Sequence, residues 1–130
     1  MLTFLNSRCH QACPLVGRAL GEIQRRLPAS LRPVLVAVSV NAADSAASTR
    51  AAARRWGFSR PWYWFRGSRR ELARVWREYQ IGVRREQRTI AHSAAVFLID
   101  GRCYQRALYL FPFSSSGVAR ALRLLATASS

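Results

Sequence analysis

Hydrophobic and polar positions alternate in blocks along this chain, and the blocks predict strands separated by helices. A short apolar run at residues 1–6 predicts a buried strand. From Cys13 the apolar residues recur at helical spacing, which predicts a helix that ends before Pro28. The valine-rich run at residues 33–40 is typical of a central strand covered on both faces. Two strands joined by a helix in this way form a right-handed parallel crossover.

The next two blocks predict a second helix and a third strand. Residues 41–48 are small and polar, and Asp44 or Ser45 is suited to cap a helix that ends near Gly57. The aromatic residues at 61–65 predict a short strand. Aromatic side chains also stack on nucleotide bases, but packing against the core is the favoured interpretation here.

The remaining blocks predict a third helix, a hairpin and a last helix. A capping box at residues 68–71 precedes apolar residues at helical spacing, and the helix is expected to end near Gly82. The polar and basic residues 83–91 predict a loop. Two strands then flank Asp100-Gly101, a pair typical of a two-residue hairpin turn. Serines at 114–116 are expected to cap the final helix.

The order of these elements is β-α-β-α-β-α-β-β-α. It predicts an α/β protein of thioredoxin-like architecture, with a central mixed sheet, helices on both faces, a closing antiparallel hairpin and a C-terminal helix. At 130 residues the chain is expected to form a single domain over residues 1–130. In this topology the loop after the first strand lies close to the segment that precedes the hairpin strand.

Charge changes this picture little. The formal net charge is +15, and all 21 basic residues are arginines. They are spread along the chain and never occur in runs longer than two, which is typical of a solvated surface, so no nucleic-acid partner is expected. The excess charge should still attract acidic partners. The sequence shows neither an export signal nor an apolar run of the ~20 residues that a membrane helix needs.

Two cysteines carry the most distinctive chemistry. Cys9 and Cys13 are separated by three residues and followed by Pro14, which is expected at the first helical position. The helix dipole favours a thiolate there, so we expect Cys9 or Cys13 to have a lowered pKa. Such thiolates exchange disulfides or bind soft metals. The third cysteine, Cys103, is expected to be a packed or partly exposed thiol.

A histidine is predicted to join this pair. His92 immediately precedes the hairpin strand, so the topology brings it to the loop that carries Cys9 and Cys13. Two thiolates and one imidazole suit Cu(I), or Cu(II) with an added ligand, whereas zinc would want a fourth partner. His10 is the competing histidine, because it lies inside the cysteine loop.

At this point the sequence resembles the SCO/SenC family of copper chaperones, which are thioredoxin-like proteins. The resemblance rests on Leu2-Thr3-Phe4, Cys9-His10-Gln11-Ala12-Cys13-Pro14, Val36-Ala37-Val38-Ser39-Val40, Ala91-His92-Ser93 and Phe97-Leu98-Ile99-Asp100-Gly101. It implies a copper site made by Cys9, Cys13 and His92. It also implies a role in assembling the dinuclear copper site of cytochrome c oxidase. The expected partner is the oxidase subunit with that site, or another copper or thiol protein.

The resemblance also implies a location and exposes two departures. Family members are expected on the periplasmic face of the bacterial inner membrane, held by an N-terminal anchor. This chain begins almost at the first strand, so we expect that the anchor and a first segment are missing through truncation or a misassigned start. The family tends to have Asp-Pro after the central strand, where this chain has Asn41-Ala42, with Asp44 out of register.

Several functions stay open on the sequence alone. The first is copper binding and transfer without enzymatic turnover. The alternative is a thiol–disulfide oxidoreductase that uses the Cys9/Cys13 pair as its redox residues, although dedicated oxidoreductases usually have two residues between the cysteines. A peroxidase has weak support from Ser7-Arg8-Cys9. A nucleic-acid-binding module rests on charge alone.

Overall fold

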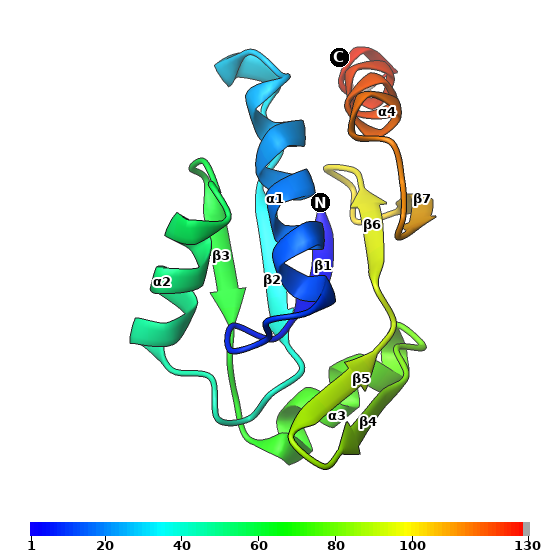
Figure 1. Cartoon of the computed structure of the whole chain (residues 1–130). Helices are drawn as coiled ribbons and strands as arrows, with labels where there is room; N and C mark the ends of the chain where they lie inside the picture. Colours follow the sequence, from blue (N-terminus) through cyan, green and yellow to red (C-terminus); the bar gives the residue numbers. More distant parts are fainter. Residues whose placement is uncertain (129–130) are drawn as a thin grey trace.

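A five-stranded mixed sheet forms the centre of the computed structural model, which describes residues 1–128 (Figure 1). The strands lie in the order β3-β2-β1-β6-β7. Their bounds are β1 Leu2–Leu5, β2 Leu35–Ser39, β3 Trp62–Phe65, β6 Ala95–Ile99 and β7 Gln105–Leu110. β1 pairs with β2 in parallel and with β6 in antiparallel, so the first strand of the chain is the central one.

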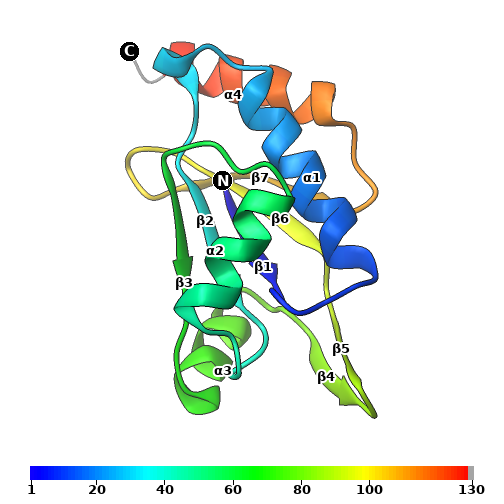
Figure 2. The same ribbon diagram turned by 60° about the vertical axis from the view of Figure 1, so that its left-hand side comes forward.

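Helices cover both faces of this sheet (Figures 1 and 2). α1 (Ala12–Arg25), α2 (Ala46–Arg55) and α4 (Ser115–Ala128) pack on one face, and α3 (Arg69–Glu78) packs on the other. A short 3-10 helix, Ala29–Leu31, follows α1. The sheet, the antiparallel β6–β7 pair and the closing helix confirm the predicted fold class. No helix within residues 1–128 has the length and apolar character required to span a membrane.

The apolar runs of the sequence are explained by two cores on opposite faces of the sheet. In β1, Leu5 faces the core under α1 and Phe4 faces the core under α3, and both are fully buried. Neighbouring residues of an inner strand therefore both have to be apolar. Complete burial of such a side chain contributes about 1.5–3 kcal/mol. The two cores fix β1 firmly, and β1 leads directly into the cysteine loop.

The aromatic strand β3 forms one edge of the sheet and alternates between packing and exposure. Trp62 and Trp64 pack against the core under α1 and α2, where Trp64 lies 5.9 Å from Trp56 between ring centroids. Tyr63 and Phe65 point to the opposite face and are each 58% exposed. Core packing thus accounts for Trp62 and Trp64, but not for Tyr63 and Phe65.

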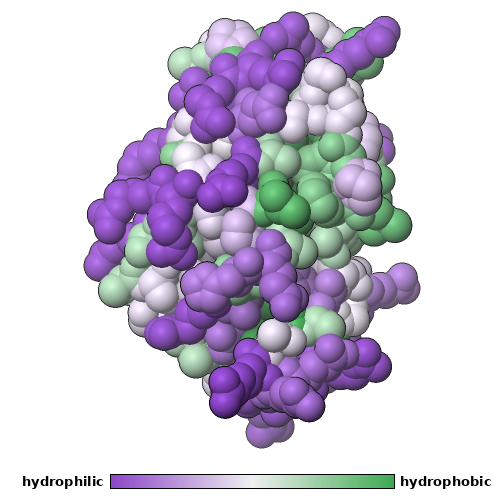
Figure 3. All heavy atoms as spheres, in the orientation of Figure 1, coloured by the Kyte–Doolittle hydropathy of each residue, from purple (hydrophilic) through white to green (hydrophobic). Residues whose placement is uncertain are grey.

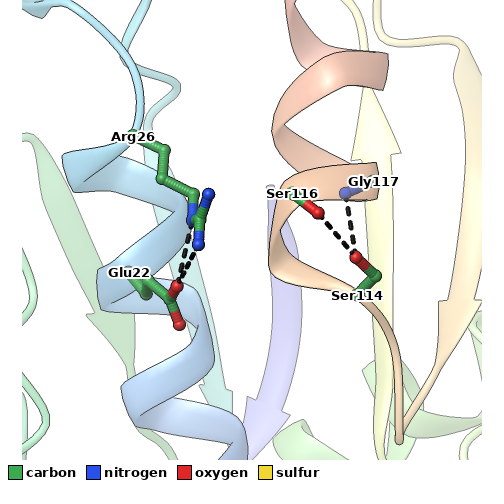
Figure 4. Close-up of polar contacts among 5 residues, drawn as sticks. All are labelled: Glu22, Arg26, Ser114, Ser116 and Gly117. Carbon is green, nitrogen blue, oxygen red and sulfur yellow. Dashed lines mark hydrogen bonds and ion pairs between the residues drawn. The ribbon is translucent and has the colours of Figure 1, made fainter.

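The last helix has its own cap and lies along α1. The hydroxyl of Ser114 accepts a hydrogen bond from the Gly117 backbone N–H at 3.2 Å, as the serine cluster predicts (Figure 4). Figure 4 also shows the exposed Glu22–Arg26 pair on α1, one turn apart at 2.7 Å. Exposed pairs of this kind add little to stability. α1 and α4 contribute apolar residues to the same core, and the Arg123 guanidinium on α4 donates to the Arg26 carbonyl at 2.8 Å.

The loop predicted at residues 83–91 is wrong. The segment forms a separate two-stranded sheet of β4 (Val83–Glu86) and β5 (Thr89–His92), which extends away from the main sheet (Figures 1 and 2). Residues 84–89 are all exposed and four of them are charged, so no apolar alternation marks the hairpin in the sequence. Backbone pairing makes it a hairpin nonetheless, and His92 lies at its base opposite Val83.

The two-residue turn predicted at Asp100-Gly101 is also wrong. β6 and β7 are joined through residues 100–104, because Ile99 pairs with Gln105. The Asp100 carboxylate accepts hydrogen bonds from the backbone N–H groups of residues 102 and 104, which holds the wider loop. Cys103, at φ 67°, takes the left-handed conformation and is exposed rather than packed.

Candidate metal centre

The cysteine loop begins where β1 ends and runs into α1. Cys9 lies in the loop, and Cys13 is the second residue of the helix. The helix begins at Ala12, earlier than the sequence predicts, and Pro14 is its third residue. A proline is tolerated there, because the first four backbone N–H groups of a helix have no intrahelical partner. The early start moves Cys13 from the helix end into the packed first turn.

Cys13 is buried, and this reverses the expected direction of its pKa. Its side chain is 1% exposed, and burial raises the pKa of the Cys13 thiol to about 12. A backbone hydrogen bond from Asn6 lowers the pKa in part, while the neighbouring Cys9 raises it further. The predicted lowering is therefore wrong for Cys13, since removal from water outweighs the helix dipole. Cys13 is a neutral thiol at neutral pH.

His92 meets Cys13 from the base of the β4–β5 hairpin. Its Nε2 lies 3.2 Å from the Cys13 Sγ, and its Nδ1 lies 3.0 Å from the carbonyl oxygen of Ser93. A carbonyl only accepts, so Nδ1 carries the hydrogen and Nε2 presents a lone pair to the thiol. Burial lowers the pKa of His92, and the hydrogen bond to Ser93 opposes this only in part. The ring is thus neutral with its hydrogen on Nδ1, and Nε2 is the nitrogen that could bind a metal.

Cys9 is the more open of the two thiols. It is half-buried, its Sγ accepts a hydrogen bond from the Gln11 backbone N–H at 3.4 Å, and all three cysteines of the chain are free. Within residues 1–128 no three metal-ligating side chains are already gathered closely enough to hold an ion. The structure brings Cys13 and His92 into contact and places Cys9 beside Cys13, whereas His10 is exposed.

A cavity of about 390 Å³ opens beside Cys9. α1 contributes Pro14, Leu15 and Arg18 to its wall, and α2 with the residue after it contributes Arg55 and Trp56. His10 lines this cavity as well, on the side of Cys9. The candidate centre therefore has direct access to a hollow on the surface.

A buried polar network supports the cysteine loop, and the sequence does not predict it. The Asp44 carboxylate is buried and accepts hydrogen bonds from the hydroxyls of Ser7 at 2.5 Å and Ser39 at 2.8 Å. The Trp64 indole N–H donates to the Ser39 hydroxyl at 2.9 Å. Ser45, not Asp44, caps α2. Asp44 instead ties the start of the cysteine loop to the end of β2.

Asn41, which stands where the family tends to have Asp, also supports the cysteine loop through hydrogen bonds. The Asn41 amide donates to the Asn6 side-chain oxygen at 3.1 Å, and Asn6 also accepts from the Arg8 backbone N–H at 3.0 Å. Neither asparagine carries a signal in the sequence that would mark it as a support of the loop. Both act through side chains that meet only after β1 and β2 have paired.

Known proteins resemble this chain both in sequence pattern and in fold. Residues 1–126 match the family model described as SCO1/SenC. The chain belongs to the SCO1/SenC family. No match was found among curated proteins.

Solved structures share the fold at low sequence identity. A SCO1/SenC family lipoprotein from Bacillus anthracis is 18% identical, with a TM-score of 0.85 over 96% of this chain and 80% of its own. ScoI from Bradyrhizobium japonicum, solved with copper bound, is 18% identical, with a TM-score of 0.81 over 95% of this chain and 82% of its own. BsSco, described as a member of the Sco family of cytochrome c oxidase assembly proteins, is 15% identical, with a TM-score of 0.78 over 97% and 78%.

Proposed function

We propose that this chain binds copper through Cys9, Cys13 and His92 and delivers it during assembly of the dinuclear copper site of cytochrome c oxidase. The observation that carries the proposal is the 3.2 Å contact between the Cys13 Sγ and the His92 Nε2, with Nδ1 engaged by a backbone carbonyl. Family membership supports it, as do the copper-bound ScoI and the oxidase-assembly protein among the similar structures. The proposed location is the periplasmic face of the inner membrane. A lipoprotein among the similar structures supports attachment to a membrane.

The donor set fits copper in its chemistry. Two sulfurs and one imidazole nitrogen form a soft to borderline set that suits Cu(I), and Cu(II) with a further ligand. Cys13 and His92 are held together by burial, and Cys9 would complete the set through a small movement of its loop. Binding would displace the protons of the thiols, so the affinity for copper would rise with pH.

The test is a competition between the reduced protein and a Cu(I) chelator. The wild-type chain should bind one Cu(I), and His92→Ala should weaken binding by more than about tenfold. His10→Ala is the matched control, because it removes the other histidine of the chain, and Cys103→Ser removes the remote thiol. Both controls should keep the wild-type affinity. An unchanged affinity in His92→Ala would remove this histidine from the site.

A thiol–disulfide oxidoreductase is the second candidate, favoured by the cavity beside Cys9. Cys13 stays protonated at neutral pH, so Cys9 would attack a disulfide of the recipient. Cys13 would then close a disulfide with Cys9 and release the recipient as two thiols. The chain's pair is oxidised as the recipient's pair is reduced. Reduction of a disulfide-containing recipient peptide, measured with and without copper, separates the two candidates: copper should block it, and His92→Ala should leave it largely intact.

A further inference from the structure

The cavity beside Cys9 has an apolar floor and an open rim. Trp56 at the floor is only 2% exposed, whereas Leu15 at the rim is 55% exposed. Pro14 completes the apolar wall next to the thiol. At about 390 Å³ the hollow is large enough for a few side chains of a bound segment, but not for a whole domain. Leu15, Pro14 and Trp56 together give the hollow an apolar side next to the Cys9 thiol.

Two arginines face this hollow without a counter-ion. The Arg18 guanidinium has no hydrogen-bond or ion-pair partner among the described residues, and the Arg55 guanidinium donates only to the backbone oxygen of Ser7, at 3.3 Å. None of the six acidic residues of the chain lines the cavity. They are Glu22, Asp44, Glu71, Glu78, Glu86 and Asp100. The two guanidinium groups therefore offer positive charge to a ligand rather than to a neighbour in the fold.

Figure 3 shows the surroundings of this hollow. Hydrophilic side chains dominate the side of the molecule where α2 lies and the end where the β4–β5 hairpin lies, while an apolar patch lies over the opposite side, near β6 and β7. α2 contributes Arg50, Arg54 and Arg55 and no acidic residue, so the surface that it forms is positive. A negative segment would be steered toward it before contact.

We infer that the cavity is the docking groove for an acidic segment of the copper recipient, one whose cysteine is flanked by carboxylates. The inference rests on the proposed function, because it names the segment that would meet Cys9. The recipient's cysteine would lie at the Cys9 end of the groove, and its carboxylates would pair with Arg18 and Arg55. Arginine suits this task, because its planar fork binds a carboxylate with two parallel hydrogen bonds. An apolar side chain beside the carboxylates would rest on Leu15.

The experiment measures binding of synthetic peptides to the copper-free, reduced chain by fluorescence anisotropy. Two labelled peptides of about ten residues carry serine in place of the central cysteine, which prevents disulfide exchange. One has glutamates beside this serine, and the other has glutamines. The glutamate peptide should bind at least about tenfold more tightly at low salt, and raising the salt should remove most of the difference.

Variants of the groove locate the effect. Arg18→Gln and Arg55→Gln should each cost the glutamate peptide about two- to fivefold in affinity, and the double variant should remove most of its advantage. Arg54→Gln is the matched control, because this exposed arginine is the neighbour of Arg55 on α2 but does not line the cavity. Arg18 is the cleaner test of the two, since Arg55 also contacts the cysteine loop.

The outcomes separate this inference from the proposed function. Equal binding of the two peptides would overturn the preference for an acidic segment. An equal loss in Arg54→Gln would overturn the groove and leave only the general positive charge. Copper affinity of Arg18→Gln, measured by the chelator competition, should equal that of the wild type. A chain that prefers the glutamate peptide but binds no copper would refute the copper function and keep the groove. A chain that binds copper but does not prefer the glutamate peptide would refute the groove and keep the copper function.

Discussion

The two thiols of the candidate centre lie in very different surroundings. Cys13 is buried in the first turn of α1, in contact with His92 and close to the Asp44 network. Cys9 is half-buried in the preceding loop and lines a cavity with His10 on its wall. Only four positions separate the two residues in sequence. Their exposure differs because α1 turns Cys13, its second residue, inward, while the loop that carries Cys9 stays at the surface.

This difference assigns separate tasks to the two halves. The buried half presents its donors in a set geometry, since both cores of the sheet and the polar network hold it. The open half is the one that an incoming molecule reaches first. In the copper site proposed above, Cys13 and His92 would supply the fixed donors, and Cys9 would be the donor that an incoming molecule can reach. Four measurements would test this difference between a buried and an accessible thiol.

Alkylation should show the largest contrast between the halves. In a Cys103→Ser background, Cys13→Ser leaves only Cys9 and Cys9→Ser leaves only Cys13. With a pKa of about 12, roughly one Cys13 in ten thousand is ionised at pH 8. We expect iodoacetamide to modify Cys9 about 100- to 1,000-fold faster, measured by mass spectrometry. Equal rates in the two folded variants would show that the burial of Cys13 does not control its chemistry.

The support of the buried half should be costly to remove. Asp44→Ala removes the acceptor of the buried Ser39 hydroxyl and leaves the Ser7 hydroxyl with Ser48 as its remaining acceptor. We expect a loss of about 2–4 kcal/mol in the free energy of unfolding, measured with urea. Glu86→Ala, on the exposed hairpin, is the control and should unfold at nearly the wild-type urea concentration. Similar midpoints for both variants would refute a supporting role for the network.

Acid should weaken the buried half through His92. Burial lowers the pKa of His92 in the folded chain below 6.5, the ordinary value for histidine, so the unfolded chain binds a proton more readily. Stability should therefore be complete above pH 6.5 and decline as the pH falls through and below it. His92→Gln should flatten this decline in urea unfolding measured at a series of pH values. His10→Gln should retain it, and a retained slope in His92→Gln would contradict the argument.

The smallest effect is expected at an exposed ion pair on the β4–β5 hairpin, whose base carries His92. Arg84 and Glu86 form an exposed pair at 2.5 Å, with 79% and 46% of the two side chains open to solvent. Arg84→Ala should change the free energy of unfolding by about 0.5 kcal/mol or less. Copper affinity should not change either. A large loss in either measurement would mean that the hairpin contributes to the site beyond placing His92.

Elements with a regular apolar pattern could be predicted from the sequence, and those without one could not. The buried strands around Phe4 and Val38 and the capped helix after Ser68 occur as predicted. The β4–β5 hairpin was missed because its strands face solvent, so their pairing leaves no trace in hydropathy. The turn at Asp100 was mistaken because the side chain of Asp100 holds a wider loop than the Asp-Gly pair suggests.

The order of the main elements and the family could be predicted from the sequence, because periodicity and motif spacing are local properties of the chain. The sequence also named the two cysteines and the histidine as candidates. Only the tertiary structure decided how the two thiols differ. Burial of Cys13 and the open cavity beside Cys9 arise from packing between segments far apart in the chain. The pKa of a thiol depends on that packing and not on its place along a helix alone, so the pKa shift predicted from the helix dipole has the wrong sign for Cys13.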